Sequence, residues 1–134
     1  MAKALGLHII ADLYGVEGDL IDRVEDIRAL LEGAVKYANL TKISSHYYQF
    51  RPHGATGVVL IAESHISIHT WPELGIATVD VYTCGDPQQC VEAMNFIIEK
   101  LKPKRVDKKV FERGLIEEGQ KKTIDLIREG VIKA

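Results

Sequence analysis

Two segments of the chain place their apolar residues at the spacing of an amphipathic helix, and each lies between stretches that are typical of β-strands. The first covers residues 20–38 and the second covers residues 91–101. Asp19 is placed to cap the first helix, while Asp86 and Pro87 supply a cap and a first-turn proline for the second. Because an amphipathic helix must bury its apolar face, the surrounding strands are expected to form the sheet that both helices cover.

The strands predicted around these helices arrange the two halves of the chain in a similar way. Strands are expected at residues 4–14, 41–50, 57–62, 65–69, 76–82 and 105–111, and a terminal helix at residues 116–132. The order is β-α-β-β and then β-β-α-β, which hints at an internal duplication. Helices that cover one face of a mainly antiparallel sheet predict an α+β fold, a two-layer sandwich.

Length and charge favour one domain with a small-molecule partner. The 134 residues can bury a real core but are too few for two substantial domains, so we treat residues 1–134 as a single domain. The formal net charge is −2, and the basic residues do not gather in one block. We therefore expect no nucleic acid partner and no membrane partner.

The cysteines and the apolar stretches indicate where such a protein works. Cys84 and Cys90 match neither the spacing of a zinc site nor a disulfide framework, so a reducing compartment is expected. Polar residues interrupt the first 14 residues, and no apolar run approaches the roughly 20 residues that a membrane span needs. We expect a soluble, cytoplasmic protein.

Residues 62–73 concentrate polar groups between apolar strands and are the best candidates for chemistry. In the simplest interpretation, Ser64, His65 and His69 lie on the wet face of a strand and have no chemical role. A metal is not expected, because a straight strand separates His65 from His69 by about 13 Å. On the same strand, Ser64 and His69 would lie about 16 Å apart on opposite faces. Their cooperation therefore requires a bend or turn near Ser64.

Ordered blocks of the sequence are similar to one known family. They are residues 54–59, 63–73 and 81–85, with residues 5–8 and 101–105 as further matches. Over residues 4–113 the chain resembles the short prokaryotic S-adenosylmethionine decarboxylases, which are self-processing, pyruvoyl-dependent proenzymes. Residues 114–134 add nothing to this resemblance.

The resemblance implies that the precursor cuts itself between Glu63 and Ser64 into chains 1–63 and 64–134. The Ser64 hydroxyl would attack the Glu63 carbonyl, and β-elimination by a base at His69 would lead to a covalent pyruvoyl group derived from Ser64. This cofactor would bind the substrate amine as a Schiff base and stabilise the carbanion left by decarboxylation.

The resemblance assigns protonation of the product carbon to Cys84. Taken alone, Cys84 would more often be a buried small apolar residue, and Cys90 keeps that interpretation. The place of Cys84 at the end of a strand, just before Gly85, makes a role in a pocket feasible.

Further assignments also follow from the resemblance. Thr56 stands where the family keeps a small hydroxyl residue that aids processing. Phe50 would stack on adenine, Trp71 would wall the pocket, and Glu73 would accept the ribose hydroxyls. The alternative for each is an ordinary structural role, as an aromatic residue of the core or as a carboxylate in a turn. The family also implies a homodimer of two-chain protomers with facing sheets.

The predicted function is decarboxylation of S-adenosylmethionine, which supplies aminopropyl groups for spermidine. A pyruvoyl-dependent arginine decarboxylase on the same scaffold is one alternative, but the aromatic-rich stretch of residues 47–50 favours a nucleoside, because adenine needs a stacking surface. A regulatory homologue that does not process itself is the other. The presence of the cleavage pair together with His69 and Cys84 argues against it.

Overall fold

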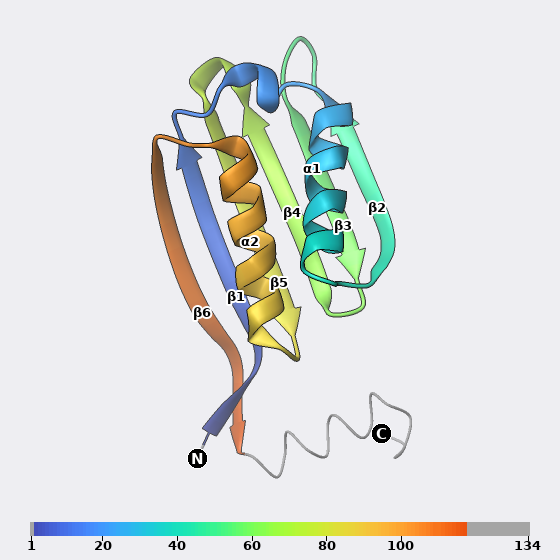
Figure 1. Ribbon diagram of the computed structural model, residues 1–134, viewed down its shortest axis with the longest axis vertical. Helices are drawn as coiled ribbons and strands as arrows, with labels where there is room; N and C mark the ends of the chain where they lie inside the picture. Colours follow the sequence, from blue (N-terminus) through green and yellow to red (C-terminus); the bar gives the residue numbers. More distant parts are fainter. Residues whose placement is uncertain (1, 118–134) are drawn as a thin grey trace.

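The structure is a computed structural model that describes residues 2–117 and is built on one antiparallel sheet. Within these residues six strands lie in the order β2-β3-β4-β5-β1-β6, and every neighbouring pair is antiparallel (Figure 1). Their bounds are β1 Ala2–Tyr14, β2 Lys42–Gln49, β3 Ala55–Ile61, β4 Ser64–Trp71, β5 Ile76–Cys84 and β6 Arg105–Glu117. The first strand of the chain therefore lies inside the sheet, as predicted.

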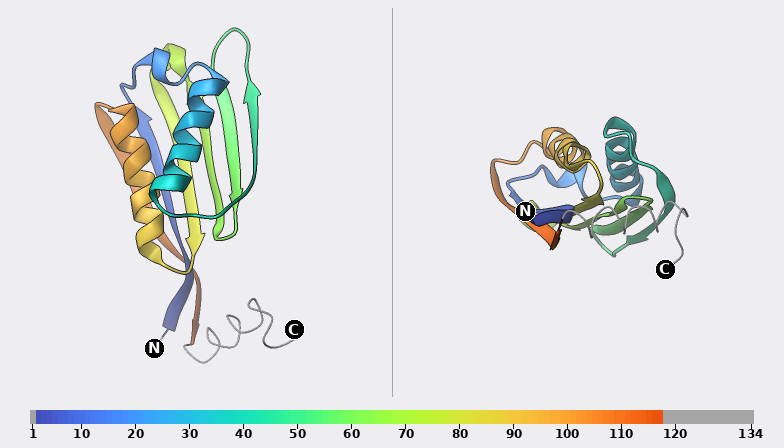
Figure 2. Two further views of the ribbon diagram at one scale, coloured as in Figure 1. Left: turned by 45° about the vertical axis from the view of Figure 1, so that its right-hand side comes forward. Right: turned by 90° about the horizontal axis from the view of Figure 1, so that it is seen from below.

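Two α-helices of the described part of the chain cover one face of this sheet and leave the other face open. They are α1 at Val24–Tyr37 and α2 at Pro87–Leu101, with short 3-10 helices η1 at Gly18–Leu20 and η2 at Pro72–Leu74. Both α-helices lie on the same side of the sheet (Figure 2). The predicted two-layer α+β sandwich is confirmed. No helix within residues 2–117 is long and apolar enough to cross a membrane.

The core lies between the sheet and the helices because side chains alternate along each strand. In β5, Ala77, Val79 and Val81 are buried, while the residues between them are partly exposed. Large, fully buried side chains of this core are Leu13, Ile21, Ile27, Leu31, Ile61, Ile66, Ile68, Met94 and Ile97. Full burial of one such side chain is worth about 1.5–3 kcal/mol. The alternate residues form the open face of the sheet.

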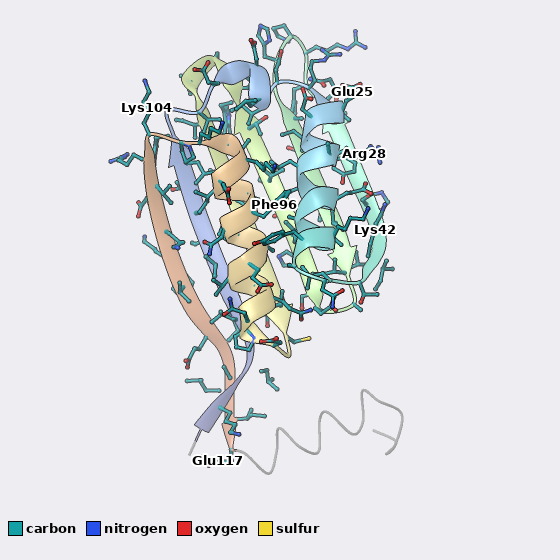
Figure 3. All side chains as sticks on the ribbon, in the orientation of Figure 1. Glu25, Arg28, Lys42, Phe96, Lys104 and Glu117 are labelled. Atoms are coloured by element: carbon teal, nitrogen blue, oxygen red, sulfur yellow. The ribbon has the colours of Figure 1, made fainter. Side chains whose placement is uncertain are left out.

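The two helices touch where a glycine makes room for an aromatic ring. A Cβ atom at Gly33 of α1 would lie 2.9 Å from the ring of Phe96 in α2. Figure 3 shows the Phe96 side chain between the two helices. Any larger residue at position 33 would force this ring to move.

The first helix begins later than predicted. α1 starts at Val24, and Asp19 belongs to η1 and does not cap it. The side chain of Gln49 takes over this role, because its Oε1 accepts the Val24 amide at 2.8 Å. The second helix is capped as predicted, with Asp86 accepting the Gln88 amide at 2.9 Å.

The last strand is longer than predicted. β6 runs to Glu117 because it stays paired with β1, and Ile116 lies opposite Lys3. The helix predicted over residues 116–132 is therefore wrong at its first two positions. The remainder of that prediction lies outside the described residues.

Candidate active site

Two of the predicted catalytic residues lie near opposite ends of one strand. Ser64 is the first residue of β4 and follows the turn from β3, whereas His69 lies five residues along β4. β4 keeps an unbroken register with both neighbouring strands, so no bend within it draws the two residues together. At the rise of a β-strand their separation is about 16 Å. Within one chain they cannot touch.

The predicted cleavage pair lies beside Cys84. Ser64 is opposite Thr83 in the register of β4 and β5, and the Cys84 amide donates to the Glu63 carbonyl oxygen at 2.8 Å. Ser64 has a φ of +151°, in a region where a residue other than glycine is strained by about 1–3 kcal/mol. The carbonyl that Ser64 is predicted to attack is thus held by a fixed donor.

The far end of β4 joins Thr56 to His69. The two residues are opposite one another in β3 and β4, and Thr56 Oγ1 lies 3.0 Å from His69 Nδ1. In the tautomer that donates Nδ1–H to Thr56, Nε2 is the basic nitrogen. His69 is exposed, so this nitrogen is accessible to an approaching group.

A cavity of about 390 Å³ lies at the same end of the sheet as His69. Its wall includes Phe50, Thr56, His69, Trp71 and Glu73. This volume is within the range of small-molecule sites. A second hollow of about 360 Å³, between α1 and α2, contains none of the predicted site residues. The structure therefore gathers five predicted residues around one cavity and leaves the cleavage pair and its cysteine at the other end.

Two residues that no local motif marks fix the loop that carries Phe50. One oxygen of Asp22 accepts the Gly54 amide at 3.1 Å and lies 3.2 Å from His53 Nδ1. The Gly54 amide, with a smaller contribution from His53, holds the pKa of Asp22 below its usual value. Gln49 Nε2 donates to the carbonyl oxygens of Asp22 and Gly54, both at 2.9 Å. These contacts span distant parts of the chain, so only the folded structure reveals them.

A further group of ionisable side chains lies on the open face, across β4, β5 and β1. His65 and His8 both lie opposite Tyr82 in the register, and their rings are 6.1 Å apart. His8 Nε2 lies 3.2 Å from Asp80 Oδ2, and Arg113 Nη1 donates to His8 Nδ1 at 2.9 Å. The structure thus places His65 beside His8, in a cluster that the sequence did not predict.

The side chains of this cluster are of the types that bind metals, but hydrogen bonds within the cluster occupy both ring nitrogens of His8. Ligand atoms of His8, His65 and Asp80 lie within 4.8 Å of one another. Because His8 Nδ1 accepts from Arg113, neutral His8 carries its proton on Nε2, which then donates to Asp80. That nitrogen cannot bind a metal in the same state. Burial lowers the pKa of His65, which favours its neutral form beside His8.

Most of the chain matches one family model. The model described as S-adenosylmethionine decarboxylase covers residues 7–114. The chain belongs to the S-adenosylmethionine decarboxylase family. The family predicted from the three sequence blocks is thereby confirmed.

Relatives in this family are similar along most of their length. The S-adenosylmethionine decarboxylase proenzyme of Aquifex aeolicus is 79% identical over 118 residues, which cover 88% of this chain and 87% of the relative. That of Thermoplasma acidophilum is 51% identical over 126 residues, or 93% of this chain and 96% of the relative. The crystal structure of the Aquifex aeolicus adenosylmethionine decarboxylase aligns with a TM-score of 0.85 at 78% identity, covering 87% of this chain and 96% of that one. These names do not favour the arginine decarboxylase alternative.

Proposed function

We propose that this family member is a single-domain proenzyme, residues 1–134, which cleaves itself between Glu63 and Ser64 and then decarboxylates S-adenosylmethionine. The contact between the Cys84 amide and the Glu63 carbonyl, directly before Ser64, supports this proposal best. It provides what an acyl shift needs, a fixed donor at the oxygen that becomes negatively charged.

Self-cleavage begins when the Ser64 hydroxyl attacks the Glu63 carbonyl carbon and the amide is converted into an ester. The Cys84 amide, 2.8 Å from the carbonyl oxygen, stabilises the negative charge that develops on it. One such donor is typically worth about 10²–10³-fold in rate. The strained φ at Ser64 favours the reaction further, because the amide bond before this residue is broken.

The second step needs a base at the α-carbon of residue 64. Loss of the α-proton releases the Glu63 carboxylate and leaves a dehydroalanine, which water converts to the pyruvoyl group with release of ammonia. We assign the base to His69 Nε2, with Thr56 beside Nδ1. However, about 16 Å of strand separates His69 from residue 64 of the same chain.

A second copy of the chain would bring the two ends together. If two sheets stack with their open faces inward, about a two-fold axis that runs across the strands, the Ser64 end of each meets the His69 end of the other. The open face carries exposed aromatic residues that such stacking would cover, including Trp71 and Phe111. We therefore propose a homodimer whose two sites each combine residues of both copies.

Each site would then take Cys84 from one copy and the substrate cavity from the other. The pyruvoyl group supplies a ketone that withdraws electrons from the substrate. Cys84 ends β5 next to residue 64, where its thiol can protonate the product carbon. In the cavity, Phe50 and Trp71 offer aromatic surfaces for adenine, and Glu73 offers a carboxylate for ribose hydroxyls. We place this reaction in the cytoplasm, as a source of aminopropyl groups for spermidine.

Intact-mass analysis of the purified protein tests self-processing. We expect chains 1–63 and 64–134 with masses of about 7 and 8 kDa, and the second chain should begin with a pyruvoyl group. Ser64→Ala should remain a single chain, because the attacking hydroxyl is gone. A stable 14.9 kDa species with intact Ser64 after long incubation would contradict the proposal.

Release of carbon dioxide from carboxyl-labelled amino acids tests the substrate. Labelled S-adenosylmethionine should release carbon dioxide, and labelled arginine should not. Phe50→Ala should weaken transition-state binding of S-adenosylmethionine by about 1–3 kcal/mol, the scale of a base stacked on an aromatic side chain. Release from arginine alone would overturn the substrate and leave the pyruvoyl chemistry in place.

A further inference from the structure

The side-chain carboxylate of Glu63 is held at both oxygens by one residue. The Thr41 amide donates to Oε1 at 3.1 Å, and the Thr41 hydroxyl donates to Oε2 at 3.2 Å. The Thr41 carbonyl also accepts the amide of Ala62 at 2.8 Å. Three hydrogen bonds therefore connect Thr41 to the turn between β3 and β4.

This turn is held from two sides. Thr41 lies directly before β2 and Cys84 ends β5, and these two strands flank the β3–β4 hairpin on opposite sides (Figure 1). The Glu63 side chain bonds to Thr41, while its backbone carbonyl accepts from Cys84. A movement of Glu63 away from Cys84 would therefore also disturb its contacts with Thr41. The position of the scissile carbonyl is coupled to Thr41.

The neighbouring cation does not take part in this contact. Lys42, labelled in Figure 3, places its ammonium 2.8 Å from Glu32 Oε1 of α1. This hydrogen bond is the main reason that the pKa of Glu32 is lowered. Within residues 2–117 the Glu63 carboxylate forms no ion pair, so the neutral donors of Thr41 orient it. The contact depends on direction rather than on charge.

We propose that Thr41 is a positioning residue for self-cleavage, which keeps the Glu63 carbonyl against the Cys84 amide while Ser64 attacks. This inference rests on the proposed self-processing function. In the step itself, Ser64 Oγ bonds to the Glu63 carbonyl carbon, and the C–N bond between Glu63 and Ser64 breaks. The Ser64 nitrogen takes up the proton of the hydroxyl and becomes a free amine. Thr41 exchanges no proton or electron, so its loss should slow cleavage and leave the products unchanged.

Pulse–chase labelling during cell-free synthesis measures the cleavage rate of the full chain. Labelled leucine marks both products, because Leu5 lies in residues 1–63 and Leu74 in residues 64–134. Thr41→Val removes the hydroxyl and keeps the branched shape and the backbone amide. We expect cleavage to slow by about 10- to 100-fold, because a 1 Å misplacement of reacting groups can have an effect of that size.

Three companion variants separate positioning from a general loss of structure. Thr41→Ser restores the hydroxyl and should recover most of the rate at an unchanged melting temperature. Lys42→Met, the matched control, disturbs the adjacent residue without touching Glu63 and should cleave at the wild-type rate. Glu63→Met removes both acceptors and should also be slow, and adding Thr41→Val should slow it little further. If Thr41→Val folds poorly, Glu63→Met decides the question.

Each outcome distinguishes this inference from the proposed function. Wild-type rates in Thr41→Val or in Glu63→Met would overturn the role of Thr41 and leave self-processing in place. A slow Thr41→Ser variant, or a slow Lys42→Met control, would also overturn it. A wild-type chain that never cleaves would overturn the proposed function, and the inference with it.

Discussion

Mixed dimers of two inactive variants can reveal whether the base comes from the second copy. Ser64→Ala keeps the base and loses the attacking hydroxyl, whereas His69→Ala keeps the hydroxyl and loses the base. A general base must come within about 3 Å of its partner, but about 16 Å of strand separates the two positions in one chain. Each variant alone should therefore yield no pyruvoyl-bearing chain, and a mixed dimer should contain one complete site.

The complete site joins Ser64 of the His69→Ala chain to His69 of the Ser64→Ala chain. Random pairing of equal amounts places about half of the chains in mixed dimers, so about half of the His69→Ala chains should mature. No Ser64→Ala chain should mature. The two variants are synthesised together, with an N-terminal tag on the His69→Ala chain. Mass spectrometry then counts the fragments 64–134 that begin with a pyruvoyl group.

The matched control replaces Ser64→Ala with the double variant Ser64→Ala/His69→Ala, which offers neither group. Together with His69→Ala it should yield no pyruvoyl-bearing fragment. A fragment that begins with serine reports hydrolysis of the ester without elimination and does not count as maturation. If the original mixture also yields no pyruvoyl-bearing fragment, although mixed dimers form, then the base is not His69 of the second copy.

Three further variants test single contacts. Cys84→Ala keeps the backbone amide, so it should still cleave itself but lose about 10²–10⁴-fold in carbon dioxide release, and unaltered turnover would remove Cys84 from the mechanism. Thr83 is 1% exposed, and within residues 2–117 its hydroxyl has no nitrogen or oxygen partner and only the weakly accepting Cys90 thiol beside it, so Thr83→Val should raise the free energy of unfolding in urea by about 1 kcal/mol. A lower value would mean that the hydroxyl is satisfied. The Gly54 amide is the main reason that the pKa of Asp22 is lower in the folded protein than in the unfolded chain. The ionised Asp22 carboxylate therefore stabilises the fold fully above its unfolded pKa, and this contribution is lost as pH falls through its folded pKa. Asp22→Asn should therefore melt lower than wild type at neutral pH, with a smaller difference in acid, and equal melting curves at every pH would contradict this.

Apolar spacing was sufficient to predict both helices and the two-layer fold, because each element must bury one face. It could not predict where some elements begin and end. Val24 starts α1 because Gln49, 25 positions away, provides the acceptor for its amide. Ile116 stays extended because Lys3 lies opposite it in β1. Neither partner can be found from the local pattern, since both depend on the order of strands in the sheet.

Local motifs identified the candidate residues but not how they are distributed in space. Ser64 and His69 belong to one motif, yet a regular strand holds them apart. Cys84 lies far along the chain from the cleavage pair, yet the register of β4 and β5 brings its amide to Glu63. Thr41 lies outside every motif and touches Glu63 only because β2 lies beside the β3–β4 hairpin in the sheet.

This distribution orders the proposed reaction. The groups for the first step, the Ser64 hydroxyl, the Glu63 carbonyl and the Cys84 amide, all belong to one chain and are already adjacent. His69, the base we propose for the second step, lies near the other end of the same strand, so one chain cannot supply it to its own Ser64. In the proposed mechanism a monomer can therefore form the ester, but only the proposed dimer can eliminate it to the pyruvoyl group. Such coupling of the second step to assembly would restrict formation of the reactive ketone to molecules whose substrate cavity is already in place.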